Sequence, residues 1–237
     1  MLLAKTIVAT GASSGMGFEL LKHLLTANPS PTAQPYRIIM GARDVPRTLA
    51  AFDTLHYDTA RHSVTVLPLE LFDLAGTREF ARESLKRLAA QHYLLHLFRD
   101  KLVESKSRVI IVSSGAVSLT LTMTAESLEK DLRADTVIDL YTTYCQTKFI
   151  QLVSAHWWRR ELAGKATVVA VSPGFIPGTN LVKKSGLFSE DMPGAQSIAE
   201  GRYLELALQE KWSPSKEAIE KEAGLSDWAE APIPQAI

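Results

Sequence analysis

Residues 4–25 of this chain, AKTIVATGASSGMGFELLKHLL, decide its fold. The run from Ala4 to Thr10 is short, apolar and rich in β-branched residues, which is typical of a buried strand. Phe18 to Leu25 carries apolar side chains at helical spacing. Between the two lies a glycine-rich turn, Thr10-Gly11-Ala12-Ser13-Ser14-Gly15-Met16-Gly17. Strand, turn and helix in this order predict the opening unit of an α/β fold.

The same alternation continues along the chain. Strand-like runs follow at residues 36–41, 63–69, 108–113 and 167–171. Helical patterns lie between them, at residues 45–57, 74–103 and 140–162. Strands that alternate with helices predict a doubly wound parallel sheet of the Rossmann type, and ligands of such sheets bind beyond the carboxyl ends of the strands.

Length and composition predict a single domain with a tail. The 237 residues, 46% of them hydrophobic, are enough for one core and few for two. We expect the domain to span residues 1–210 and a loosely packed tail, which has prolines and no strand signal, to span 211–237. Basic and acidic residues balance at 26 each, so we expect a small-molecule partner rather than nucleic acid or an anionic membrane.

The cysteine content and the amino terminus indicate a reducing compartment. The one cysteine, Cys145, cannot form an internal disulfide, and the first residues lack the pattern of a signal peptide. No window approaches the roughly 18 uninterrupted apolar residues that a membrane helix needs. We therefore expect a cytoplasmic protein without a membrane span.

The glycine-rich turn predicts a dinucleotide site. Gly11, Gly15 and Gly17 allow a sharp bend and a close approach of the backbone to a pyrophosphate, which the N–H groups at the helix start would bind. A P-loop needs Lys and then Ser or Thr after its last glycine, whereas Phe18 and Glu19 follow here. The alternative is a turn that only reverses the chain.

Arg43 follows the second predicted strand, where dinucleotide folds distinguish the adenosine riboses. A guanidinium pairs with a 2′-phosphate, so Arg43 predicts NADP(H) rather than NAD(H). The neighbouring Asp44 weakens this prediction, and a solvated surface arginine is the alternative. Asp73 and Leu74, after the third strand, are placed to meet the adenine, although Asp73 is equally suited to cap the next helix.

Two residues four positions apart, Tyr144 and Lys148, predict acid–base chemistry, because a helix places them on one face. The phenol has a reference pKa of about 10, and a nearby ammonium lowers that pKa by favouring the phenolate. Ser113 and Ser114 follow a predicted strand at the edge where a substrate would lie, and a serine there can hydrogen-bond a carbonyl oxygen. Each residue alone would be interpreted as a surface residue, but the set predicts catalysis.

The histidines do not predict a metal site. There are six of them, His23, His56, His62, His92, His96 and His156. His92 and His96 are spaced i and i+4, but no carboxylate or cysteine completes a recognisable ligand set. We interpret all six as helix residues.

Together the motifs resemble the short-chain dehydrogenase/reductase superfamily, and its retinol-dehydrogenase-like and fungal secondary-metabolism branches in particular. That superfamily shows a TGxxxGxG turn, an active-site serine and a YxxxK motif, which are similar to Thr10–Gly17, Ser114 and Tyr144 with Lys148. A later segment resembles the family's PG segment, which faces the nicotinamide, namely Ser172-Pro173-Gly174 with Thr179.

The resemblance implies reversible hydride transfer between NAD(P)(H) and a carbonyl or alcohol. In that scheme Tyr144 is the general acid/base, Lys148 lowers its pKa and holds the nicotinamide ribose, and Ser114 orients the carbonyl oxygen. Members of the family often form dimers or tetramers, so a homo-oligomer is implied as well. The expected cofactor contacts are Thr10, Gly11, Ser13, Ser14, Gly15, Met16, Gly17, Arg43, Asp73, Leu74, Tyr144, Lys148, Pro173, Gly174 and Thr179.

The chain departs from the family pattern in two places. The interval between the active-site serine and the tyrosine is longer than in many members, so a loop or small helix at residues 124–133 is expected beside the substrate site. Residues 73–108 have room for one helical stretch only, so the family's fourth strand, its NNAG-like motif and its tetrad asparagine are expected to be missing. The two asparagines of the chain are Asn28 and Asn180.

Three hypotheses follow from these motifs. The first is an NADP(H)-dependent oxidoreductase that acts on a small or medium apolar carbonyl or alcohol. The second is a degenerate dinucleotide-binding protein without turnover, because closing the gap left by a strand would shift its neighbours by about 4.8 Å, beyond the tolerance of catalytic geometry. The third is a chain that cannot fold stably.

Overall fold

The computed structural model describes residues 4–26, 34–69, 77–120, 124–132, 139–177 and residue 195. The elements, in chain order, are β1 (Lys5–Thr10), α1 (Gly15–Thr26), β2 (Tyr36–Ala42), α2 (Val45–Asp53), β3 (Ser63–Pro68), α3 (Thr77–Glu104), β4 (Arg108–Val112), the 3₁₀ helix η1 (Gly115–Thr120), α4 (Ala125–Leu132), α5 (Leu140–Glu161) and β5 (Thr167–Val171). The chain divides into two compact units, residues 1–70 with 175–202, and residues 71–174 with 203–237.

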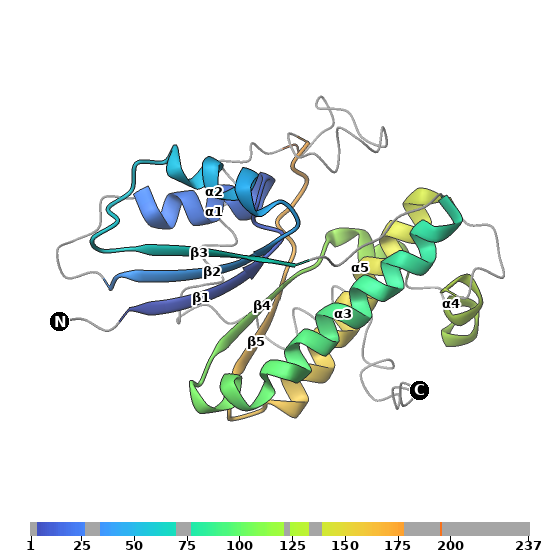
Figure 1. Cartoon of the computed structure of the whole chain (residues 1–237). Helices are drawn as coiled ribbons and strands as arrows, with labels where there is room; N and C mark the ends of the chain where they lie inside the picture. The colour runs from blue at the N-terminus through green and yellow to red at the C-terminus, as the bar shows by residue number, and fades with distance from the viewer. Residues whose placement is uncertain are drawn as a thin grey trace. The chain divides into compact units, whose positions relative to one another are not determined.

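The first unit is a parallel sheet in the order β1-β2-β3 with α1 and α2 on one face (Figure 1). Ile38 and Met40 are two residues apart on β2, so both side chains face the helices. They form one buried core with Leu21 and Leu25 of α1 and Phe52 of α2. The predicted α/β fold of Rossmann type with parallel strands is confirmed.

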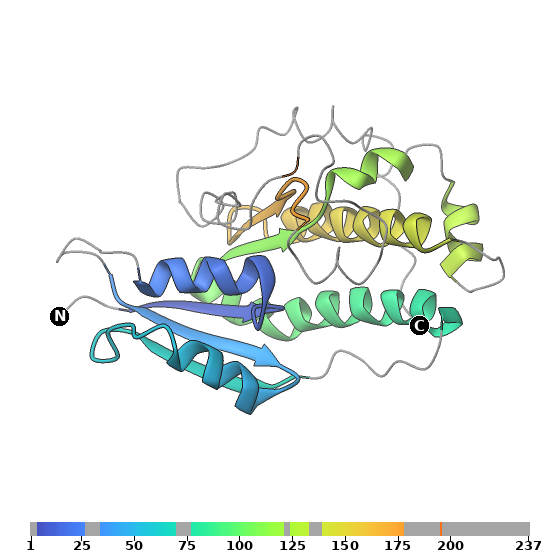
Figure 2. The ribbon, with the colours of Figure 1, turned by 90° about the horizontal axis from the view of Figure 1, so that it is seen from above.

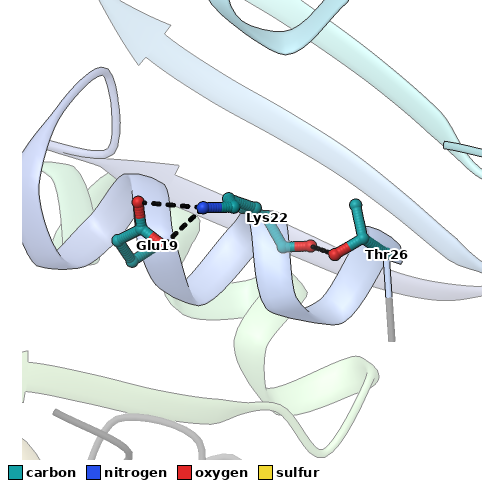
Figure 3. Close-up of polar contacts among 3 residues, drawn as sticks. All are labelled: Glu19, Lys22 and Thr26. Atoms are coloured by element: carbon teal, nitrogen blue, oxygen red, sulfur yellow. Dashed lines mark hydrogen bonds and ion pairs between the residues drawn. The ribbon is translucent and has the colours of Figure 1, made fainter. Parts of the chain in front are cut away.

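Helix α1 begins at Gly15, three residues before the first residue of the predicted helix. Apolar spacing does not detect a first turn made of glycines, which have low helix propensity. Along α1 the Lys22 ammonium lies 3.0 Å from one carboxylate oxygen of Glu19, and the Thr26 hydroxyl donates to the Lys22 carbonyl at 2.9 Å (Figure 3). Such a partly exposed ion pair adds little stability beside the buried leucines.

Helix α2 ends at Asp53, four residues earlier than predicted. The backbone N–H of Thr54 turns back to the carbonyls of Ala50 and Phe52 and closes the helix. His56 follows in the left-handed region, at φ 48°. The interpretation of all six histidines as helix residues is therefore wrong for His56 and also for His62, which directly precedes β3.

The second unit pairs β4 with β5 in parallel and packs α5 against both strands. Helix α3 lies beside α5, as Figure 2 shows. Trp158 of α5 and Leu162, which directly follows α5, are fully buried and pack with Val109 of β4 and Val168 of β5. A second cluster joins η1, α4 and α5 through Val117, Leu128, Phe149 and Leu152.

The interval between β3 and β4 contains the long helix α3, as predicted. The residues described in that interval, 77–107, form no strand. Accordingly β1 is an edge strand of one described sheet and β4 belongs to another. The segment at residues 124–133, predicted as a loop or small helix, contains the short helix α4. Asp73, Leu74, Thr179 and the tail from residue 211 lie outside the described residues.

Two further findings concern the described residues as a whole. None of their helices combines the length and the apolar content that a membrane span requires. Nor do they contain three His, Cys, Asp or Glu side chains grouped so that they could hold a metal ion.

Helices α3 and α5 are joined by His92, whose ring lies near both Trp157 and Trp158, with centroid distances of 4.9 and 5.1 Å. The indole N–H of Trp158 donates to His92 Nδ1 at 3.1 Å. An indole nitrogen is a donor only, so Nδ1 must accept and the ring is neutral in this contact. Burial, followed by the charge of His96, lowers the pKa of His92.

We expect this contact to make stability depend on pH. The pKa of His92 is lower in the folded than in the unfolded state, so below about pH 6.5 the unfolded chain binds more protons and the free energy of unfolding falls. Urea unfolding monitored by tryptophan fluorescence should show this loss as the pH drops toward the folded pKa. A His92→Gln variant keeps an acceptor for Trp158 but cannot titrate. Its free energy of unfolding should therefore fall less over the same pH interval. Equal pH slopes in the two proteins would contradict the assignment.

Candidate functional site

The glycine turn after β1 has the geometry that a dinucleotide requires. Gly11 and Gly15 adopt φ values of 68° and 61°, which favour glycine. A Cβ placed on Gly17 would lie 2.8 Å from both Ala12 Cα and the Gly11 carbonyl oxygen. The backbone of the turn therefore packs directly on the first turn of α1, whose N–H groups start there. These residues fit a bound pyrophosphate.

Arg43 lies at the same edge of the first unit as the glycine turn. In the register of the sheet Thr10 pairs with Gly41 and Gly41 with Leu67, so the three strands end level at their carboxyl ends. Arg43 follows β2 directly and is exposed. The carboxylate of Asp44 caps α2 by accepting from the Arg47 N–H at 2.9 Å. Asp44 is thus used as a helix cap, and the Arg43 guanidinium is exposed beside it.

The two serines after β4 have different partners in the second unit. The Ser113 hydroxyl is buried and donates to the Lys148 carbonyl at 3.0 Å, which fixes α5 to the end of β4. Ser114 is hydrogen-bonded to the Tyr144 hydroxyl. Its own hydroxyl oxygen accepts from the Ala116 N–H at 3.2 Å. Ser114, which the sequence predicts as catalytic, is therefore the serine that reaches the phenol.

Tyr144 lies in the second turn of α5. The helix is fixed at its start by Asp139, whose carboxylate accepts from the N–H groups of Tyr141 and Thr142, both at 2.9 Å. Tyr144 is partly buried, and burial raises its pKa, with the Ser114 hydrogen bond acting in the opposite direction. The sequence predicts a pKa lowered by Lys148, and this prediction is wrong for the chain alone because desolvation outweighs the other effects.

The Lys148 ammonium lies 5.9 Å from the centroid of the Tyr144 ring. It donates to the carbonyl of Val112, the last residue of β4, at 3.1 Å and to Gln151 Oε1 at 3.0 Å. Burial lowers the pKa of Lys148 to about 8. Desolvation thus moves both groups toward their neutral forms, phenol and amine.

The segment after β5 reaches the same end of the second unit. Ser172 Oγ accepts from the Gly115 N–H at 2.9 Å, which ties the segment to the start of η1. Pro173 follows, and Gly174 has φ 83°. The structure thus places Pro173 and Gly174 near the loop that carries Ser114.

Helix α4 is anchored on α5, the helix that carries Tyr144. Gln146, two residues after Tyr144, donates to the carboxylate of Asp131 in α4 at 2.5 Å. Leu128 of α4 is buried against Phe149 and Leu152 of α5. Both contacts hold α4 in place against α5.

Sequence reasoning missed Gln151 and Gln91. Gln151 is buried and connects the lysine to α3, where Gln91 accepts from its amide at 3.0 Å. The available signal was the spacing of Gln151, seven residues after Tyr144 and thus on the same helix face.

The chain is similar to known oxidoreductases in sequence. It is 42% identical over 215 residues to the Short-chain dehydrogenase/reductase GME11359 of Pestalotiopsis microspora, an alignment that covers 76% of this chain and 72% of that protein. It is 27% identical over 220 residues to Retinol dehydrogenase 12 of Bos taurus, with 78% and 66% covered. No protein-family model matches the chain.

Solved structures show the same fold at low identity. The bulky-bulky ketone specific alcohol dehydrogenase from Comamonas testosteroni superposes with a TM-score of 0.61 at 14% identity and covers 100% of this chain and 98% of its own. The NADPH bound carbonyl reductase from chicken fatty liver gives 0.60 at 17% identity, with 90% and 93% covered.

The close packing at Gly17 predicts that this position tolerates only glycine. In Gly17→Ala the new methyl group would meet two backbone atoms, so the turn must shift, and we expect a loss of stability on the order of 1–3 kcal/mol. Gly115→Ala is the matched control, because its Cβ would lie 3.8 Å from Ser172 Oγ, an ordinary contact. Urea unfolding of both variants measures the difference, and equal midpoints would contradict the packing described here.

Proposed function

The chain belongs to the short-chain dehydrogenase/reductase family, and on that premise we propose that it transfers a hydride between NADP(H) and the carbonyl or alcohol group of an apolar substrate. Its relatives make it an oxidoreductase. The observation that carries the finer proposal is the set of Ser114, Tyr144 and Lys148 at one end of the second unit, with the phenol hydrogen-bonded to the serine.

The preference for NADP(H) rests on Arg43. Its guanidinium is exposed at the carboxyl edge of the first sheet, and the acidic neighbour Asp44 is engaged as the cap of α2. A guanidinium at this position favours a 2′-phosphate. The chicken carbonyl reductase, which shares the fold, was solved with NADPH bound. In the first unit, Gly11–Gly17 would hold the pyrophosphate.

Tyr144 is proposed as the proton donor for carbonyl reduction. Its raised pKa keeps the phenol protonated near neutral pH, so it can donate a proton to the alkoxide that develops when a carbonyl accepts hydride. When bound, the reduced nicotinamide supplies that hydride. Ser114 orients the carbonyl oxygen by a hydrogen bond, and the Lys148 ammonium stabilises the phenolate left behind.

An apolar substrate is favoured by the relatives and by the inserted helix. Retinol dehydrogenase 12 is named for an apolar alcohol. Helix α4 is held on α5, the helix that carries Tyr144, by the hydrogen bond between Asp131 and Gln146 and by the packing of Leu128. We propose that α4 sets which carbonyl compounds reach the phenol.

Removing the Tyr144 hydroxyl should abolish reduction. Tyr144→Phe keeps the ring and its packing but removes the transferable proton, so we expect kcat with NADPH and a carbonyl substrate to fall on the order of 10²–10⁴-fold. NADPH binding, measured by thermal shift or fluorescence titration, should persist.

Tyr141→Phe is the matched control, since Tyr141 lies one turn earlier on the same helix. Turnover by Tyr144→Phe at the wild-type rate would reject the catalytic role. NADPH binding by the wild type without turnover on a panel of ketones and aldehydes would instead favour a dinucleotide-binding protein without catalysis.

Arg43 should determine the choice of cofactor. In Arg43→Ala we expect the Kd for NADPH to rise about 10- to 100-fold, because a charge-assisted hydrogen bond is worth about 1.5–3 kcal/mol. The Kd for NADH should change little. Arg37→Ala is the control, because Arg37 is exposed near the opposite end of β2. Equal effects of Arg43→Ala on both cofactors would contradict the assignment.

A further inference from the structure

A chain of three polar side chains, Lys148, Gln151 and Gln91, links α5 to α3. The Lys148 ammonium donates to Gln151 Oε1 at 3.0 Å, and Gln151 Nε2 donates to Gln91 Oε1 at 3.0 Å. Gln151 is buried, with 8% of its surface exposed. The two glutamines are 60 residues apart in sequence.

The direction of this chain is dictated by the lysine. An ammonium is a donor only, so it requires the oxygen of Gln151 on its side. The Gln151 amide nitrogen must then face α3, where it requires an acceptor, and Gln91 presents its oxygen. Rotating either amide by half a turn would set two donors or two acceptors against each other. Gln91 therefore holds Gln151 in the one orientation that accepts from Lys148.

Neutral oxygens hold the Lys148 charge. Its acceptors among the described residues are the Val112 carbonyl and Gln151, and burial is the cause of its lowered pKa. Of the titratable side chains that the structure describes on the elements packed around it, Tyr144 faces it from the same helix. On α3, His92 bonds to Ser154 and Trp158 instead.

We propose that Gln151, locked by Gln91, is a positioning residue that holds the Lys148 ammonium in its place beneath Tyr144. Neither glutamine contacts the reacting groups directly. This inference rests on the proposed function for its catalytic meaning, because only there does the lysine charge stabilise a phenolate. The hydrogen-bond chain itself is a property of the second unit and is testable without turnover.

The proposal predicts opposite effects of two substitutions at one position. Gln151→Leu removes an oxygen dipole from a desolvated ammonium, so the pKa of Lys148 should fall. Gln151→Glu places a carboxylate at the same distance, so the pKa should rise by about one unit or more. Gln91→Leu removes the partner that orients Gln151 but leaves Gln151 Oε1 as the acceptor for Lys148. The pKa of Lys148 should therefore fall, as in Gln151→Leu, but by less.

The experiment is an NMR titration of the full chain labelled with ¹³C,¹⁵N-lysine, in which the Nζ shift of Lys148 is followed from about pH 6 to about pH 10. Lys148→Arg assigns the signal. Gln146→Leu is the matched control, because Gln146 is a buried glutamine on the same helix that bonds to Asp131 of α4. Its titration should coincide with that of the wild type.

The proposal would be overturned if Lys148 titrated as in the wild type in both Gln151 variants. It would also be overturned if Gln146→Leu shifted the pKa of Lys148 as much as the Gln151 variants do. If Gln151→Leu does not unfold cooperatively, the test rests on Gln151→Glu. An unshifted Lys148 titration curve in that variant would also overturn the proposal. If Lys148 titrates in Gln91→Leu as it does in the wild type, Gln91 does not orient Gln151. In an active enzyme the basic limb of kcat should move with the pKa while KM for the carbonyl stays constant. An inactive protein that shows the predicted shifts would reject the catalytic function and support the network.

Discussion

The second unit depends on an ammonium group that is taken out of water and held by neutral oxygens. Removing a charge from solvent is costly unless oriented dipoles replace its hydration. The Val112 carbonyl at the end of β4 and the Gln151 amide on α5 provide those dipoles. Because the lysine itself belongs to α5, its bond to Val112 fixes the register between the helix and the end of β4. Ser113 reinforces the same register by donating to the Lys148 carbonyl.

Tyr144 and Lys148 respond to the same desolvation in opposite directions. Burial raises the pKa of the phenol and lowers that of the amine, so each is pushed toward its neutral form. The Ser114 hydrogen bond counteracts this at the phenol. The result is a neutral phenol beside a cation whose charge is only marginally stable, which is a state that small changes in the surroundings can alter. A pair exposed to water would be far less responsive, because solvent screens it.

The sequence predicted the elements well where periodicity and propensity agree. The strand at Thr167–Val171 has the predicted bounds, and α5 ends one residue before the predicted limit. The strand is a run of apolar and β-branched residues, which is typical of a buried parallel strand, and the helix has apolar residues at helical spacing. The start of α1 was missed because the glycines that shape the turn conceal the first helical residues. The end of α2 was missed because its closing hydrogen bonds from Thr54 involve the backbone, which leaves no pattern of side chains.

The proximity of Ser114, Tyr144 and Lys148 was predictable from the sequence, whereas the pKa shifts of Tyr144 and Lys148 were not. A spacing of four residues shows that Tyr144 and Lys148 are neighbours, but desolvation depends on what packs around them, and Gln91 lies on another helix. That helix is also the main departure from the family pattern, because α3 is continuous from Thr77 to Glu104 and the residues described there form no strand. In the sequence, a helix in place of the family's fourth strand argues against catalysis. The same helix, α3, supplies Gln91, which orients Gln151. A strand would place alternate side chains on opposite faces, whereas a long helix beside α5 can present Gln91 to Gln151 while its next residue, His92, contacts Trp158.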